Sequence, residues 1–193
     1  MARSKHILAL CVAAGALLWT GCAERVGLNY AFDLQRPQGW LTHSNVGFKS
    51  GDQFRLRLIP EQNCFLYVFN YNTDGTYEML FPRGEESGGA NMLLEGAEVQ
   101  VPAQGTLVFD ARPGMEKMYI FASLQPLMWF EAFRGREINI PRDAVEAGIG
   151  NVTAACSVHM VHKRIEHPIF VTEVVRTHSE MPVLKCDVDI VHQ

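Results

Sequence analysis

Short segments that alternate apolar and charged residues dominate the middle of the chain, and they constrain the fold more than any other feature. Phe54–Leu58 alternates apolar residues with arginines, as expected of a strand with one face buried and the other in water. Cys64–Phe69 is apolar throughout, which is typical of a central strand covered on both faces. Turn residues, such as those of Ser50–Asp52, separate these segments. The pattern predicts a mainly β protein.

The next segments continue this pattern. Asn72–Gly75 predicts a hairpin, because Asp-Gly accommodates the positive φ values of a type I′ turn. The returning strand is Thr76–Phe81, which Pro82 ends. Further strands are expected at 98–101, 106–111 and 118–123. Six short strands at intervals of about 8–12 residues predict an antiparallel β-sandwich or partly open barrel with one or two short helices.

The C-terminal part, residues 128–193, is expected to be a β extension that packs on the same domain. Leu127–Phe133 is dense in large apolar side chains and predicts a short helix or a final core strand. It either fills the core or leaves an exposed patch for a partner. Pro141–Ala147 predicts a short helix closed by Gly148. Strands are expected at 152–160, 169–176 and 185–191, added to the sandwich or packed on its edge.

Several of these motifs together resemble a known bacterial family. The segments FKSGDQFRLRL, CFLYVFNYNTDGTYEMLFP, VQVPAQGTLVFDARPGMEKMYIFAS and QPL follow, in order, those of the family called domain of unknown function 4384, over residues 48–127. The resemblance implies an extracytoplasmic or signalling-associated β module, frequent in multidomain or lipid-anchored envelope proteins. It implies no catalytic residues.

The N-terminal residues 1–21 have the pattern of a signal peptide. Arg3 and Lys5 precede Ile7–Trp19, a run of 13 residues without charge. A membrane-spanning helix needs about 20 apolar residues, whereas a signal-peptide core needs about 7–15. Thr20-Gly21-Cys22 then resembles the bacterial lipoprotein signal, in which the cysteine receives a diacylglyceryl group and becomes the new N-terminus, although Trp19 replaces the usual branched aliphatic residue. The alternative is ordinary secretion with cleavage elsewhere.

Lipidation of Cys22 would anchor the protein in a membrane. Each buried methylene contributes about 0.8 kcal/mol, so two or more acyl chains hold firmly. In such lipoproteins an Asp directly after the cysteine commonly signals inner-membrane retention; Ala23 stands there and favours the outer membrane, with the domain facing the periplasm. Residues 22–47 show little pattern and are interpreted as a tether, docked in part through Tyr30, Phe32 and Trp40.

Charge excludes one class of partner. Without residues 1–21 the chain carries 15 basic and 21 acidic residues, a formal net charge of −6. A net acidic domain whose longest basic run is Lys163-Arg164 has no electrostatic footprint for nucleic acid.

The cysteines and histidines leave alternatives open. Cys64 is expected to be an inert, buried residue. Cys156 and Cys186 either form a disulfide in an oxidising periplasm or stay free. Cys156, His159 and His162 recur every third residue, which would suit zinc on a helix but points to opposite faces on a strand. The β-rich surroundings favour structural histidines, and no metal or other cofactor is expected.

Three function hypotheses remain. The first is a lipid-anchored, non-catalytic interaction module on the periplasmic face of the outer membrane, part of an envelope or secretion-associated complex through its sheet edges or loops. The second is a glycan- or peptidoglycan-binding module that uses exposed aromatics, with Trp40, Tyr71 and Trp129 as candidates. The third is an envelope hydrolase that uses the histidine-rich C-terminal part. No G-x-S-x-G or H-E-x-x-H motif supports catalysis.

Overall fold

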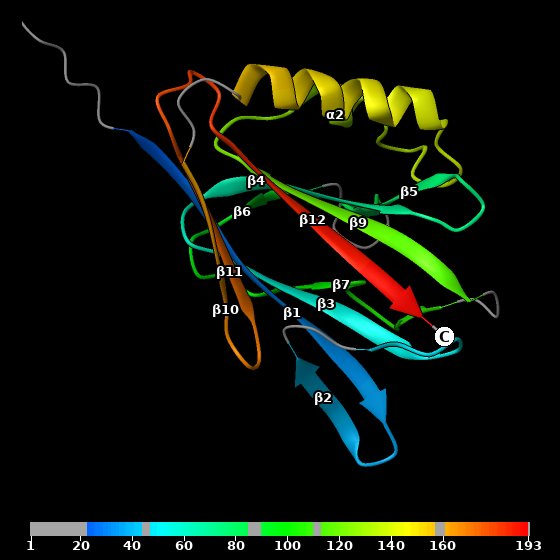
Figure 1. The fold of residues 1–193 in the computed structure, drawn as a ribbon. Helices are drawn as coiled ribbons and strands as arrows, with labels where there is room; N and C mark the ends of the chain where they lie inside the picture. Colours follow the sequence, from blue (N-terminus) through cyan, green and yellow to red (C-terminus); the bar gives the residue numbers. More distant parts are fainter. Residues whose placement is uncertain (1–22, 44–46, 85–89, 110–112, 157–160, 193) are drawn as a thin grey trace, which may run out of the picture.

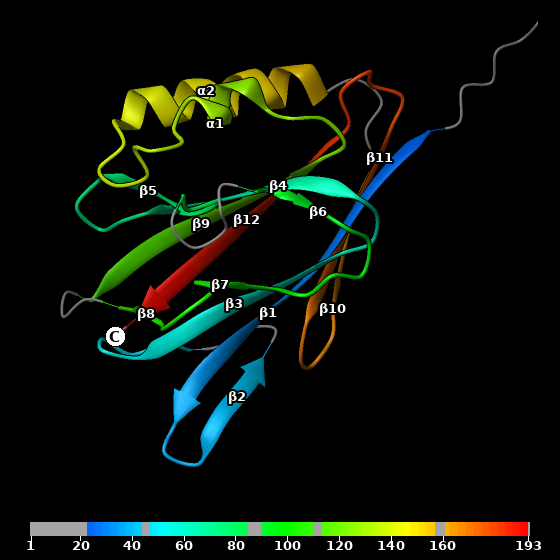
Figure 2. The same cartoon turned by 180° about the vertical axis from the view of Figure 1, so that it is seen from behind.

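Two antiparallel sheets and a layer of helices are stacked in the computed structural model, which describes residues 23–43, 47–84, 90–109, 113–156 and 161–192 (Figure 1). The five-stranded sheet lies in the middle, between a seven-stranded sheet and the helices (Figure 2). The predicted mainly β sandwich is confirmed, and the sheets do not close into a barrel.

The seven-stranded sheet has the long strand β1 (Glu24–Arg36) at its centre, between β3 (Gln53–Pro60) and the C-terminal strand β11 (Val171–Thr177). Its order is β10 (Val161–Glu166), β11, β1, β3 and β7 (Val99–Val101). In addition, β2 (Gly39–His43) pairs with β1, and β8 (Leu107–Val108) pairs with β3. The predicted strand at 106–111 is therefore shorter than expected, and β10 was not predicted.

The five-stranded sheet follows the order β12 (Val183–His192), β9 (Gly114–Ser123), β4 (Cys64–Tyr71) and β5 (Tyr77–Phe81). The short β6 (Met92–Leu93) pairs with β4. The C-terminal strands thus join both sheets: β12 pairs with β9, and β11 pairs with β1.

The interpretation of residues 22–47 as a tether is wrong for the part that the structure describes. Residues 24–36 form β1, the longest strand, which pairs with β3 on one side and with β11 and β2 on the other. Its alternate residues Val26, Leu28, Tyr30, Phe32 and Leu34 are all buried in the core. This period of two is a regular strand pattern.

The end of β1 is linked to the turn before β3 through Asp52. Its carboxylate accepts a hydrogen bond of 2.7 Å from Arg36 Nη1 and one of 2.9 Å from the backbone N–H of Lys49. Partial burial opposes ionisation of Asp52, but these two hydrogen bonds outweigh it and hold the pKa of Asp52 below its usual range.

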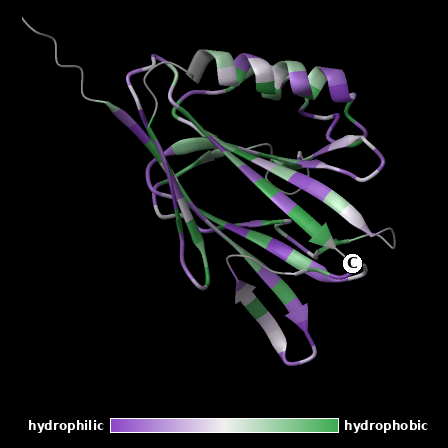
Figure 3. Ribbon diagram, in the orientation of Figure 1, coloured by the Kyte–Doolittle hydropathy of each residue, from purple (hydrophilic) through white to green (hydrophobic). Residues whose placement is uncertain are grey.

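β4 is covered on both faces, as its apolar sequence predicts. Leu66 and Val68 point into the core between the sheets, whereas Tyr67 and Phe69 point into a second core beneath the helices. The hairpin after β4 also forms, but Gly75 (φ +86°) is its sole described residue with positive φ, so the turn is not type I′. Hydrophilic and hydrophobic residues alternate along β3 (Figure 3).

The helices α1 (Met128–Glu131) and α2 (Arg142–Cys156) cover the outer face of the five-stranded sheet. The strand predicted at 152–160 is wrong over its described part, because α2 continues through Gly148 to Cys156. Gly148 does not end the helix; it provides the close approach to α1, since a Cβ there would lie 2.9 Å from Cε1 of Phe130. None of the described helices is long and apolar enough to span a bilayer.

Candidate functional site

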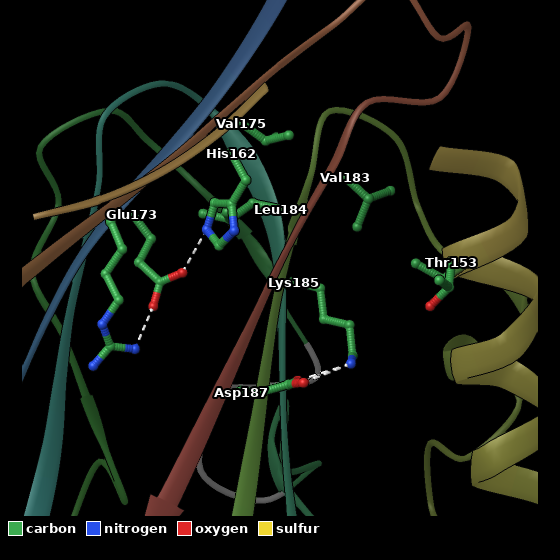
Figure 4. A pocket seen from close by; sticks show the side chains of 10 residues that line it. Thr153, His162, Glu173, Val175, Val183, Leu184, Lys185 and Asp187 are labelled. Atoms are coloured by element: carbon green, nitrogen blue, oxygen red, sulfur yellow. Dashed lines mark hydrogen bonds and ion pairs between the residues drawn. The ribbon is translucent and has the colours of Figure 1, made fainter. Parts of the chain in front are cut away.

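A groove of about 320 Å³ follows the outer edge of β12, between α2 and β10. His162 and Glu173 lie on one side of β12, and Thr153 and Lys185 lie on the other (Figure 4). β12 is the terminal strand of its sheet, and no strand of the described chain pairs with its outer edge. The lining residues are Val152, Thr153, His162, Arg164, Glu173, Val175, Val183, Leu184, Lys185 and Asp187.

A buried carboxylate forms the inner wall of this groove. Glu173 on β11 is 1% exposed. Its Oε1 accepts hydrogen bonds from Tyr30 Oη at 3.2 Å and from Arg164 Nη1 at 3.0 Å, and its Oε2 lies 2.7 Å from His162 Nε2. An ionised carboxylate only accepts hydrogen bonds, so the proton of a neutral His162 lies on Nε2. Burial of a charge costs several kcal/mol unless it is paired, and here three donors provide the pairing.

Cys186 on β12 also borders Glu173 but is not available for chemistry. Its thiol is fully buried and free. Burial, reinforced by the negative charge of Glu173, raises the pKa of Cys186 well above its usual value, so the thiol stays protonated. Of the two alternatives for Cys156 and Cys186, a disulfide or free thiols, the structure shows Cys186 free, and the side chain of Cys156 lies outside its description.

The structure describes only part of the cysteine–histidine set. Cys156 ends α2, His162 lies on β10 against Glu173, and His159 lies outside the described residues. In the parts that the structure describes, no three His, Cys, Asp or Glu side chains gather around a point where a metal ion would fit. Cys22, the predicted lipidation site, also lies outside the described residues.

The three candidate aromatics lie on different parts of the surface. Trp40 on β2 is 41% exposed, and the guanidinium of Arg55 covers its ring at 4.3 Å. Trp129 is on α1, in the opposite outer layer of the molecule (Figures 1 and 2). Tyr71 is partly buried against the second core, and its ring lies tilted against that of Tyr77. They do not form one platform for a sugar chain.

Leu127–Phe133 is partly buried and partly exposed. It forms the short helix α1 and its flanks, and Leu127 and Phe130 fill the second core. Met128 and Trp129 remain exposed. Cys64 is buried and free, as predicted, and its burial raises the pKa of the thiol to about 11.

Sequence reasoning missed the central residue of the groove, although one signal was present. Glu173 is the only charged residue in the segment Val171–Val175, which otherwise reads as a buried strand. A carboxylate in such a position needs partners. Those partners come from β1 and β10, whose pairing with β11 is set by the long-range register of the sheet.

Fold and groove together define a class of protein: a β-sandwich with one helical layer and an open sheet edge. Beside this edge, Glu173 pairs with Tyr30, His162 and Arg164, and we call these four residues the polar cluster. Within this chain, residues 47–126 match the model of the family described as Domain of unknown function (DUF4384), in agreement with the resemblance of residues 48–127. No curated protein and no solved structure matches the chain.

Proposed function

We propose that this chain is a lipid-anchored, non-catalytic interaction module on the periplasmic face of the bacterial outer membrane. In this proposal Cys22 carries the lipid, and an extended segment of an envelope or secretion-complex protein pairs with the outer edge of β12. The observation that carries the interaction role is this edge, ten residues long and bordered by a groove.

The shape of the groove supports strand addition. An extended peptide gains main-chain hydrogen bonds from an unpaired sheet edge, and pockets beside the edge select its side chains. Natural proteins usually blunt or cover such edges, so a long one bordered by a groove is suited to a partner. Val152, Val183 and Leu184 offer apolar walls, and Arg164 and Lys185 place charges at the rim.

The internal pairing of the polar cluster supports a non-catalytic role. A nucleophilic cysteine needs a lowered pKa and an adjacent base. Cys186 instead has a raised pKa, and the Nε2 of His162 is directed at Glu173. The hydrolase hypothesis therefore gains no support from the groove, and the separation of the three aromatics disfavours the glycan hypothesis.

The lipid anchor is tested by the intact mass of the protein purified from membranes. Loss of residues 1–21 together with the mass of acyl chains on Cys22 is expected. An intact leader or a bare cysteine at the new N-terminus would exclude the anchor.

The partner site is tested by photo-crosslinking in cells that express the full chain. A crosslinking amino acid at Asp187, which lines the groove, should capture a discrete envelope protein, whereas the same group at Met115, 63% exposed on the interior strand β9, should not. Thr153→Trp fills the groove from α2 and should abolish capture. Asn151→Trp is the matched control, because Asn151 is also exposed on α2 but does not line the groove. Equal capture from both crosslinking positions, or capture that survives Thr153→Trp, would refute the edge as the binding site.

A further inference from the structure

Two exposed arginines lie opposite each other in the sheet near the start of β1. In the sheet register Arg25 of β1 lies directly opposite Arg176 of β11, and Val161 of β10 lies opposite Arg176 on its other side. Like charges directly opposite each other in a sheet destabilise it, so the placement of these two arginines points to a role other than stability.

Lys163 belongs to the same surface. Val26 on β1 and Val175 on β11 point into the core, so Arg25 and Arg176 point to the outer face. On β10, His162 and Arg164 reach inward to Glu173, so Lys163 also points outward. All three basic residues are exposed. We call Arg25, Lys163 and Arg176 the basic patch.

The patch is only partly neutralised. Glu61 pairs with Arg25. Within the described part of the chain, Arg176 and Lys163 form no ion pair. Val161 beside them is 67% exposed, so an apolar side chain accompanies the positive charges.

The position of the patch along the chain suggests what covers it. Arg25 is three residues after Cys22, and an extended chain spans at most about 3.6 Å per residue, so Arg25 lies within roughly 11 Å of that cysteine. The Debye length at physiological ionic strength is about 8 Å. A lipid on Cys22 would therefore hold Arg25, at the edge of the patch, at a distance from the lipidated residue comparable with the Debye length, without a tether between them.

We propose that the basic patch docks on anionic phospholipid headgroups and so fixes the orientation of the sandwich on the membrane. This inference rests on the lipid anchor proposed above. Each exposed Lys or Arg close to an anionic bilayer contributes enough attraction to change membrane partitioning about fivefold. The start of β10, with Val161, would then face the headgroups.

The test uses the lipidated protein in vesicles of phosphatidylethanolamine, with or without phosphatidylglycerol. Val161→Cys in a Cys156→Ser background carries an environment-sensitive fluorophore. With phosphatidylglycerol we expect blue-shifted emission and weaker quenching by aqueous iodide, both reversed by high salt. The double variant Lys163→Gln/Arg176→Gln should lose the effect. Lys49→Gln/Arg142→Gln, which removes the same charge from exposed positions elsewhere, should keep it.

The outcomes separate this inference from the proposed anchor. Acylated Cys22 with identical emission and quenching in the two kinds of vesicle would overturn the docking and leave the anchor intact. Equal loss in the two double variants would show a net-charge effect and would also overturn the patch. A bare Cys22 in the intact mass would remove the anchor and the docking together.

Discussion

Arg164 forms ion pairs with two carboxylates that differ in burial but not in distance. Its Nη1 lies 3.0 Å from Oε1 of Glu173, and its Nη2 lies 3.0 Å from Oε1 of Glu166. The side chain of Glu173 is 2% exposed, whereas that of Glu166 is 60% exposed. One arginine therefore offers an internal comparison of a buried and an exposed ion pair.

The two pairs should contribute differently to stability. Exposed ion pairs contribute about 0.2–1 kcal/mol, because water screens the charges and the side chains lose rotamer freedom. Glu173 has little access to water, so loss of a donor leaves a buried charge less compensated. Arg164 itself is 39% exposed, which limits the gain. We expect a coupling energy of about 1–2 kcal/mol with Glu173 and below about 0.5 kcal/mol with Glu166.

Two double-mutant cycles measure these couplings. The first combines Arg164→Gln with Glu173→Gln, the second combines Arg164→Gln with Glu166→Gln, and the free energy of unfolding is taken from urea denaturation. Glu173→Gln alone should cost about 2–4 kcal/mol, because its donors lose a charged acceptor. Couplings of equal size in the two cycles would refute the argument that burial makes Glu173 the organising residue of the groove.

Three further predictions concern the core, the turn before β3 and the thiols. Gly148→Ala should destabilise the fold by about 1–3 kcal/mol, because its Cβ would meet the ring of Phe130. Gly150→Ala, in open space on the same helix, should stabilise the fold by about 0.5–1 kcal/mol. If the thermal unfolding temperature shifts in the same direction for both variants, this account of the packing is contradicted. Folding lowers the pKa of Asp52, so the stability lost in Asp52→Asn should be fully visible above about pH 5 and should vanish as the pH falls well below about 4. Urea titrations in which the free energies of unfolding of the two proteins differ by the same amount across this pH range would count against this prediction. The pKa of Cys64 is about 11, so iodoacetamide at about pH 8 should modify this thiol in the unfolded but not in the native chain, as read by peptide mass mapping.

Much of the fold follows from local sequence patterns. β3, β4, β5, β7 and β9 lie where alternation, apolar runs and prolines predict them. These signals are local, since each depends on a few neighbouring residues. Boundaries are less exact, as with β8, which pairs only with Gln53 and Phe54 at the start of β3.

β1 shows how a strand pattern can be missed. Its alternating apolar residues have the period of a strand, but residues 22–47 also contain Pro37, Gly39 and scattered polar residues, and the segment was interpreted as a tether with little pattern. What makes the segment a strand is distant in the sequence: Leu28 pairs with Pro60 and with Glu173. A neighbour 145 residues away leaves no local trace.

The groove could not be predicted for the same reason. Glu173 meets Tyr30 from β1, 143 residues earlier, and Arg164 from a strand that was not predicted. α2 adds Val152 and Thr153, which were assigned to a strand. The residue types were visible in the sequence, but their meeting depends on strand register between remote segments.

The matched family region does not form complete sheets in this chain. Residues 47–126 supply β3, β7 and β8 to one sheet and β4, β5, β6 and β9 to the other. β1 then completes the first sheet beside β3, and β12 completes the second beside β9. β1 alone buries five large side chains, worth about 10 kcal/mol at roughly 1.5–3 kcal/mol each, which is as much as the whole net stability of a typical domain. The flanking segments are therefore structural parts of the sandwich, and the same segments form the groove edge and the basic patch.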